Sequence, residues 1–244
     1  MPPVLSVRAL RKSFTLHTID GRVVQSLRDV DIDVRAGEHV ALAGPSGAGK
    51  SSLLRCINRN YLPDSGSVEL RTAADEQIEL TALSDRAMAR VRGREFGYVA
   101  QFLTAPPRTS PLEFVSATAR RRGVERADAR DAAAVALQRL NLDEVLWDVD
   151  CSVLSGGERQ RVNLAAGTVR PPRLLLLDEP VSALDPANRE AALELIATLT
   201  AQGVAVLAVF HDQDAMRRLA SRVVLMRDGH IVHDGPPAET AGVA

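Results

Sequence analysis

One short segment of this 244-residue chain decides its fold, namely Gly44-Pro45-Ser46-Gly47-Ala48-Gly49-Lys50-Ser51. It follows the apolar run His39–Ala43, which is typical of a buried strand, and it precedes a helical pattern over residues 51–60. Glycines in this arrangement let backbone N–H groups wrap around phosphates at the start of a helix, whose dipole favours anions. A strand, a glycine-rich turn and a helix in this order predict a phosphate-binding loop, rather than an ordinary turn that happens to fit the pattern.

Two side chains of this segment are expected to touch a nucleotide. Lys50 is predicted to reach the β- and γ-phosphates of ATP, and the Ser51 hydroxyl is predicted to ligate Mg²⁺. Of the 30 basic residues only Lys12 and Lys50 are lysines. A lysine is the compact point charge that such a loop can hold, whereas an arginine would be too bulky. Ser52 is counted with the nucleotide-binding residues, although its position in the helix favours a packing role.

A second motif, Leu174-Leu175-Leu176-Leu177-Asp178-Glu179, is an apolar run that ends in two carboxylates. Such a run is typical of a strand buried on both faces, so the carboxylates emerge at its C-terminal end, where open α/β sheets bind ligands. On its own this pattern also fits an ordinary strand end. Together with the phosphate loop it predicts that Asp178 holds Mg²⁺ and that Glu179 orients or deprotonates the attacking water.

A third motif, Leu154-Ser155-Gly156-Gly157-Glu158-Arg159-Gln160, opens a predicted helix. The Ser155 hydroxyl and the amides of Gly156 and Gly157 would form a second anion site at the helix N-terminus. Ser155 and Glu158 also fit a capping box, and the two interpretations are compatible. One chain with one ATP does not need two phosphate sites. We therefore expect two chains to face each other head to tail, each lending this segment to the other's nucleotide.

Strand patterns alternate with helical patterns on both sides of a strand-free region at residues 102–165. Strands are predicted at residues 4–7, 27–34, 39–43, 67–70, 96–100, 173–177, 204–210 and 222–226. Helices are predicted at residues 51–60, 85–92, 127–140, 187–201 and 213–220. This alternation predicts an α/β protein with a mostly parallel sheet, in which residues 1–101 and 166–244 form the core and residues 102–165 a helical insert.

Composition excludes several classes of protein. Apolar residues make up 45% and charged residues 25%, and a net charge of −1 provides no field for nucleic acid or an anionic membrane. The N-terminus lacks an apolar signal core, and no apolar run approaches the ~20 residues that cross a bilayer. The two cysteines favour a reducing compartment. We expect a cytoplasmic protein that neither binds nucleic acid nor inserts directly into a membrane.

The order of these motifs resembles that of ABC-type ATPases. Gln101 after a predicted strand, Ser182-Ala183-Leu184-Asp185 and His211 complete the resemblance, which spans nearly the whole chain. It implies the P-loop NTPase fold of a single ABC nucleotide-binding domain over residues 1–244. This domain would contain an N-terminal antiparallel β subdomain, a mostly parallel core sheet and a helical signature subdomain. It also implies Mg²⁺-dependent ATP hydrolysis by a nucleotide-sandwich dimer, formed with a second copy or with a sister ATPase.

The resemblance assigns roles to four further residues. It implies that Gln101 senses γ-phosphate or Mg²⁺, that Asp185 crosses the dimer seam and that His211 contacts γ-phosphate. Phe14 lies where the family stacks an aromatic ring on adenine, although a core phenylalanine fits the same position. Three positions depart from the residues usual in the family, at Ser52, Ala166 and Val181.

Segments outside these motifs resemble, more narrowly, the PhnL-type ATP-binding subunits of the bacterial carbon–phosphorus lyase system. They are residues 13–17, 60–64, 101–103, 107–108, 146–147, 161–163 and 210–212. This resemblance implies a soluble phosphonate-degrading enzyme core as partner. It also implies a link to ribose 1-methylphosphonate 5-triphosphate synthesis. Two alternatives remain: the ATPase of a membrane transporter, whose transmembrane subunit would sit near residues 101–111, and a nucleotide-gated assembly module with little hydrolysis.

Overall fold

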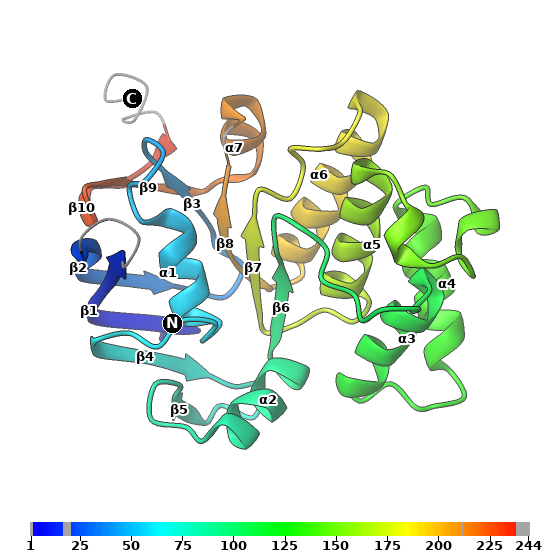
Figure 1. Ribbon diagram of the computed structural model, residues 1–244, viewed down its shortest axis with the longest axis horizontal. Coiled ribbons are helices and arrows are strands. Elements are labelled where there is room, and N and C mark those ends of the chain that lie inside the picture. The colour runs from blue at the N-terminus through cyan, green and yellow to red at the C-terminus, as the bar shows by residue number, and fades with distance from the viewer. Residues whose placement is uncertain (1, 17–20, 211, 238–244) are drawn as a thin grey trace.

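Two β-sheets organise the part of the chain that the computed structural model describes, residues 2–16, 21–210 and 212–237 (Figure 1). The six-stranded sheet has the order β10-β9-β3-β8-β7-β6. Its members are β3 (His39–Ala43), β6 (Phe96–Val99), β7 (Leu174–Asp178), β8 (Ala205–Val209), β9 (Arg222–Arg227) and β10 (His230–Gly235). Neighbouring strands from β9 to β6 are parallel, and β10 pairs with β9 antiparallel. The parallel strands therefore end at one edge, where the motifs follow them.

The apolar run of β7 is explained by burial on both faces of this sheet. Leu175 and Leu177 belong to one buried cluster, whereas Leu174 and Leu176 belong to the other. Successive side chains of a strand point to opposite faces, so a central strand covered on both sides needs apolar residues at every position. The first cluster lies under the helices that follow residue 110, and the second lies against the N-terminal sheet and the helix after β3.

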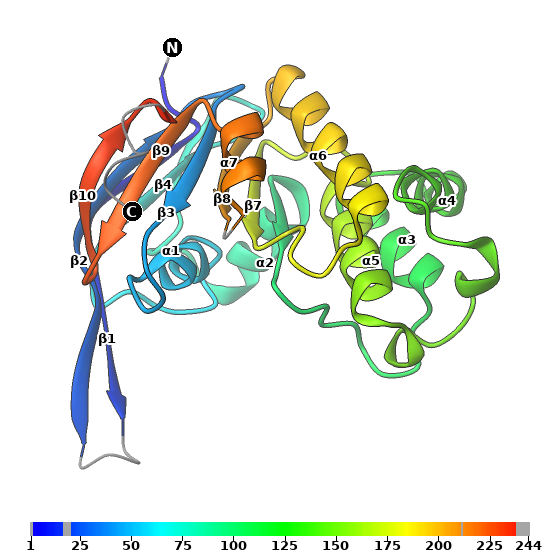
Figure 2. The same cartoon turned by 90° about the horizontal axis from the view of Figure 1, so that it is seen from above.

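A second, antiparallel sheet is formed by strands from the N-terminal part of the chain. Its strand order is β2-β1-β4-β5. Its members are β1 (Leu5–Leu16), β2 (Arg22–Val34), β4 (Ser65–Arg71) and β5 (Gln77–Glu79). Figure 2 shows β1 and β2 as a long hairpin that extends away from the helices. This sheet buries its inner face in the second cluster, and so it covers the core sheet together with the helix that starts at the phosphate loop.

Helices fill the remaining layers. On the side of the antiparallel sheet lie α1 (Lys50–Ile57) and α2 (Asp85–Arg94). The other helices are α3 (Pro111–Arg121), α4 (Ala129–Arg139), α5 (Gly156–Thr168), α6 (Pro186–Ala201) and α7 (Gln213–Leu219), with short 3-10 turns η1 (Glu144–Leu146) and η2 (Cys151–Val153). Close packing of α5 on β6 depends on glycine, since a Cβ on Gly97 would lie 2.4 Å from the Gly167 carbonyl oxygen.

The α/β fold of an ABC nucleotide-binding domain, predicted from the sequence, is confirmed. Every predicted strand and helix has a counterpart, and most bounds differ by a few residues. The helix Pro111–Arg121 and the strands Gln77–Glu79 and His230–Gly235 were missed. Much of the hairpin formed by Leu5–Leu16 and Arg22–Val34 was also not predicted. Much of the length of both hairpin strands is exposed. Apolar and polar residues therefore alternate only weakly along them, and the sequence contains little indication of a strand.

Candidate functional site

The phosphate loop joins β3 to α1, and two of its positions require glycine. Gly44 has a φ of 131°, and a Cβ there would lie 2.1 Å from the Met226 carbonyl oxygen. Gly49 has a φ of 104°, and its Cβ would lie 2.4 Å from the Ser26 carbonyl oxygen. Gly49 is also the N-cap of α1, and among the described residues no side chain caps this helix. Bare backbone at an uncapped helix N-terminus is suited to binding an anion.

Lys50 lies folded against this loop. Its Nζ donates to the carbonyl oxygens of Gly44 at 2.6 Å and Pro45 at 2.8 Å, and the residue is 6% exposed. Burial lowers the pKa of Lys50, and the charges of Glu179 and Asp178 partly offset this effect. The ammonium group now binds neutral carbonyl oxygens. It would bind phosphate oxygens more strongly than these carbonyls, because hydrogen bonds between charged groups are stronger than those to neutral groups.

Ser51 and Asp178 meet from two different elements. The Ser51 Oγ donates to Asp178 Oδ1 at 2.9 Å, and Asp178 is 1% exposed at the end of β7. A hydroxyl and a carboxylate are oxygen ligands of the kind that Mg²⁺ prefers. The described residues contain no group of three or more His, Cys, Asp or Glu side chains that could hold a metal ion. Mg²⁺ bound here would therefore take its other ligands from phosphate and water, as is usual at nucleotide sites.

Glu179 stands where the ends of three strands converge. Its φ of 54° lies in the left-handed region, which residues other than glycine rarely adopt. Its backbone N–H donates to the Val209 carbonyl oxygen at the end of β8, at 3.1 Å, and its Oε2 accepts from Gln101 Nε2 at 3.3 Å. Gln101 follows β6 closely. Strained backbone of this kind occurs where surrounding contacts hold it in place, often at active sites.

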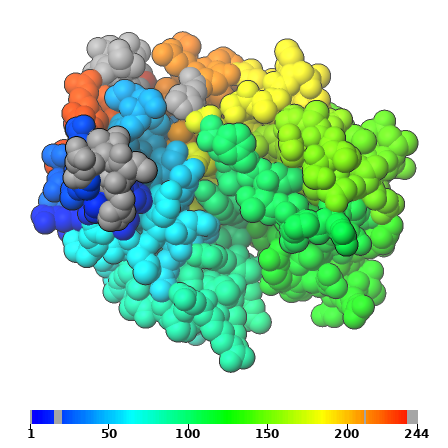
Figure 3. All heavy atoms as spheres, viewed as in Figure 1, coloured from blue at the N-terminus to red at the C-terminus, as the bar shows by residue number. Residues whose placement is uncertain are grey.

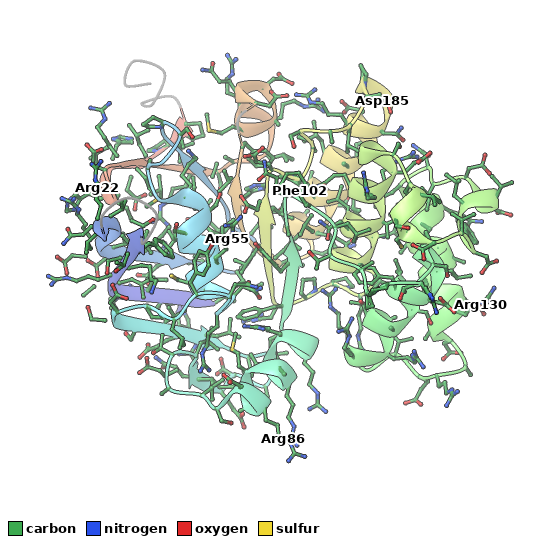
Figure 4. The ribbon with its side chains drawn as sticks, in the orientation of Figure 1. Arg22, Arg55, Arg86, Phe102, Arg130 and Asp185 are labelled. Carbon is green, nitrogen blue, oxygen red and sulfur yellow. The ribbon has the colours of Figure 1, made fainter. Side chains whose placement is uncertain are left out.

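The signature segment, residues 154–160, lies beside the segment that ends at Asp185, and within the described residues no hydrogen bond joins it to the phosphate loop. The Ser155 Oγ accepts from the Glu158 N–H at 3.3 Å, and the Glu158 carboxylate accepts from the Ser155 N–H at 2.7 Å, which is the predicted capping box. A Cβ on Gly157 would lie 3.1 Å from the Ala183 carbonyl oxygen, so this segment adjoins the one that ends at Asp185. Figure 4 shows Asp185 on the side of the helical layer, away from Arg55 on α1.

Phe14 is a half-buried residue of β1, and its ring is supported from two sides. The Tyr61 ring packs edge-on against it with centroids 5.0 Å apart, and Lys12 Nζ lies 5.3 Å from the Phe14 centroid. Arg55 on α1 donates to the Tyr61 hydroxyl at 3.0 Å. The candidate adenine platform is thus linked to the helix that begins at the phosphate loop. Its contact with adenine stays a prediction.

His211 was predicted from the sequence, whereas two contacts between distant segments were not. His211 lies outside the described residues, so its role also stays a prediction. The support of Phe14 by Tyr61 and Arg55, and an ion pair between Arg189 and Asp212 at 2.6 Å, were missed. No spacing rule points to them, because their partners lie on other elements and meet only in the folded chain.

Comparison with known proteins assigns the family. Residues 27–182 match the family model described as ABC transporter, and the chain therefore belongs to this family. It is an ABC ATPase, which binds ATP with Mg²⁺ and hydrolyses it. None of the described helices is long and apolar enough to span a bilayer.

Individual relatives cover most of the chain. It is 39% identical to the lipoprotein-releasing system ATP-binding protein LolD 2 of Caulobacter vibrioides, across 94% of this chain and 96% of that protein. It is 36% identical to the phosphonates import ATP-binding protein PhnC 1 of Rhodopseudomonas palustris, across 87% and 76%. A dimeric structure of the ATP-binding cassette MJ0796 with ADP and Pi is similar in fold, with a TM-score of 0.85 and 26% identity over 96% of this chain and 98% of that one.

Proposed function

We propose that this ABC ATPase works as one half of a nucleotide-sandwich pair, in which two ABC subunits face each other head to tail. The observation that carries the proposal is the separation of the two anion-binding segments. The phosphate loop adjoins Asp178 and the Gln101–Glu179 pair, whereas Ser155–Gly157 adjoin the segment that ends at Asp185. The phosphate loop, Asp178 and the Gln101–Glu179 pair together form a nucleotide cradle. A second subunit would bring its own signature segment to this cradle. The similar MJ0796 cassette is named as dimeric, which supports the arrangement.

The residues around the cradle divide the work of hydrolysis. Lys50 and the loop amides would bind the phosphates, and Ser51, Gln101 and Asp178 would hold Mg²⁺. Mg²⁺ supplies charge neutralisation on the phosphate oxygens. Glu179 would orient the attacking water and accept its proton, with Gln101 holding the carboxylate in place. The rate enhancement in this scheme comes mainly from positioning and electrostatics.

The remaining assignments follow from the same arrangement. Phe14 would stack on adenine, Asp185 would cross the seam between subunits, and His211 would contact γ-phosphate. In this proposal residues 102–165 act as the signature subdomain of a single domain, which carries Ser155–Gly157 toward the nucleotide of the other subunit. Residues 1–101 and 166–244 form the part that holds the chain's own nucleotide.

For the partner, we propose the soluble core of a carbon–phosphorus lyase system in the cytoplasm, where the pair would drive or gate phosphonate catabolism. The support is the resemblance of segments such as residues 60–64 and 161–163, which lie outside the general ATPase motifs. A second candidate partner is the transmembrane subunit of a membrane transporter. Two relatives of this chain are named as ATP-binding proteins of a lipoprotein-releasing system and of phosphonates import. The intact cradle argues against a third, a gated assembly module with little hydrolysis.

The variant Glu179→Gln tests the hydrolytic role. It is expected to bind ATP and to pair in its presence, but to lose nearly all turnover, because an amide cannot accept the proton of the water. Gel filtration with and without ATP, combined with a phosphate-release assay, measures both properties, and Glu194→Gln on the exposed face of α6 is the matched control. Turnover of Glu179→Gln equal to that of the wild type would contradict the assignment.

The partner is tested by affinity purification from phosphate-starved native cells, with soluble and membrane fractions kept apart. Recovery with carbon–phosphorus lyase subunits in the soluble fraction is the expected result. Recovery with a polytopic membrane protein would instead support the transporter candidate, and the ATPase assignment would stand unchanged.

A further inference from the structure

Two arginines form ion pairs between the regions of α6 and α7, which Figure 3 shows among the surface elements at the top of the molecule. Arg189 on α6 contacts Asp212 at 2.6 Å and Asp214 at 3.0 Å. Arg218 on α7 contacts Glu190 on α6. Both arginines join the same helices, but only Arg189 contacts Asp212, the residue immediately before α7.

Arg189 completes the environment of the Asp212 carboxylate. Asp212 is the N-cap of α7, and its Oδ1 accepts from the N–H groups of Asp214 at 2.8 Å and Ala215 at 3.1 Å. Its Oδ2 lies 2.6 Å from Arg189 Nη2. The Arg189 side chain is only 23% exposed. Both oxygens of Asp212 therefore have fixed donors, and the chain at residue 212 is held in position by α7 and by Arg189.

The other side of this segment is fixed by Glu179. The Glu179 N–H donates to the Val209 carbonyl oxygen at 3.1 Å, where β8 ends. Only residues 210 and 211 separate Val209 from Asp212. Both ends of this two-residue connection are thus bonded, one to the backbone of the proposed catalytic glutamate and the other to a side chain of α6.

Arg189 is also bonded to the segment proposed to cross the subunit seam. Its backbone N–H donates to the Asp185 carbonyl oxygen at 2.8 Å, one helical turn earlier. The Asp185 Oδ1 in turn accepts from the N–H groups of Ala187 and Asn188, each at 3.1 Å, and so caps α6. A change in the position of Asp185 moves the first turn of α6, and Arg189 belongs to that turn.

We propose that Arg189 is a positioning residue that couples the seating of Asp185 at the subunit seam to Asp212, the residue that caps α7. The inference rests on the proposed nucleotide-sandwich function and adds a specific link within it. When the partner subunit seats Asp185, Arg189 holds Asp212 in place, three residues after Val209, whose carbonyl oxygen accepts from the Glu179 N–H. Hydrolysis at one nucleotide then depends on the presence of the other subunit.

The competing interpretation is an ordinary surface ion pair between two helices, which contributes little to stability or function. The Arg218–Glu190 pair is the matched control for this interpretation, because it joins the same two helices and is more exposed, with side chains 41% and 45% exposed. A general role of charges in holding α7 against α6 would affect both pairs alike.

The test compares Arg189→Met, Arg189→Lys and Arg218→Met in the full-length chain, by steady-state ATP turnover over a range of ATP concentrations. We expect Arg189→Met to lower kcat about 10- to 100-fold with KM changed less than about twofold, as for a group that aligns reacting atoms. The Hill coefficient for ATP should fall from about 2 toward about 1. Arg189→Lys should recover part of kcat, since a lysine keeps the charge but not the planar fork. Arg218→Met should behave as the wild type.

Thermal unfolding of each variant separates positioning from stability. If Arg189→Met proves unstable, Asp212→Asn serves as the second variant, since asparagine still caps a helix but loses the ionic contact. Unchanged kcat and Hill coefficient in a folded Arg189 or Asp212 variant would overturn the inference. Equal losses in Arg218→Met would also overturn it. A wild-type chain that neither pairs nor hydrolyses ATP would refute the proposed function itself, and the inference with it.

Discussion

Lowering the pH should destabilise this protein through one buried histidine. His39 opens β3 with none of its surface exposed, and its ring lies 5.7 Å from that of Phe210. Neither ring nitrogen has a hydrogen-bond partner in the described part of the chain. Burial lowers the pKa of His39 from its ordinary 6.5 to about 3, because the imidazolium ion would be desolvated without compensation.

The direction of the effect follows from which state binds the proton. The unfolded chain takes up a proton on His39 below pH 6.5, whereas the folded chain holds the ring neutral down to about pH 3. Above the unfolded pKa of 6.5, neither state binds the proton and His39 has no effect on the free energy of unfolding. As the pH falls below 6.5, protonation of the unfolded chain lowers that free energy. At 1.36 kcal/mol per pKa unit, this loss is about 1.4 kcal/mol between pH 7.5 and 5.5, and about 2.7 kcal/mol by pH 4.5. A typical domain has only 5–15 kcal/mol of stability, so the effect is measurable.

Urea unfolding at a series of pH values, without nucleotide, measures this contribution. The matched control is His39→Leu, which fills a similar volume and does not titrate. All other ionisable groups contribute equally to both proteins, so the difference between their pH profiles isolates His39. The wild type should lose about 1.4 kcal/mol more than His39→Leu between pH 7.5 and 5.5. Parallel profiles would refute the reasoning, and would mean that the folded state accommodates the proton.

Three further predictions concern the loop, one buried cation and the thiols. Gly44→Ala should destabilise the chain by about 3 kcal/mol or more and abolish ATP binding, because its Cβ would lie 2.1 Å from the Met226 carbonyl oxygen. Gly47→Ala, whose Cβ meets no described atom within 4 Å, should cost only about 1–2 kcal/mol, as measured by urea unfolding. Arg122→Met should cost about 3 kcal/mol, since Arg122 is 7% exposed and donates to three backbone carbonyl oxygens, whereas the exposed neighbour Arg121→Met should change stability by less than about 0.5 kcal/mol. Burial raises the pKa of both cysteine thiols, so a thiol reagent should react slowly with the folded chain. In urea the same reagent should titrate both thiols rapidly, and fast reaction of the native chain would contradict the prediction.

The chemistry-bearing motifs were visible in the sequence because each lies within one short stretch. The glycines of residues 44–49 adopt positive φ angles, and Gly44 and Gly49 each lie close to a backbone carbonyl oxygen of another segment. They stand next to Lys50 in the sequence, so the motif is recognised as a unit. The run Leu174–Asp178 shows its burial on both faces by lacking any polar alternation. Such signals depend on neighbours along the chain, so they survive without knowledge of the fold.

Contacts between distant segments were not visible. Phe14, Tyr61 and Arg55 meet across a strand, a loop and a helix, and nothing in their spacing along the chain predicts it. Arg122 is an arginine in a run of three, which indicates a solvated helix end, yet its guanidinium is buried and binds carbonyl oxygens of Phe96, Gly167 and Arg170. Only packing of α3 against β6 and α5 decides that one member of the run is buried.

The sequence by itself determined the class of fold, the family and the residues proposed to hold phosphate and Mg²⁺, because these depend on local backbone geometry and on the order of motifs. Tertiary structure alone decided how they cooperate. It brought Gln101 to Glu179, tied Glu179 to Val209 and joined Arg189 to Asp212. The physical reason is that parallel strands far apart in sequence end at one edge of the sheet, so the groups that follow them meet only when the sheet has formed.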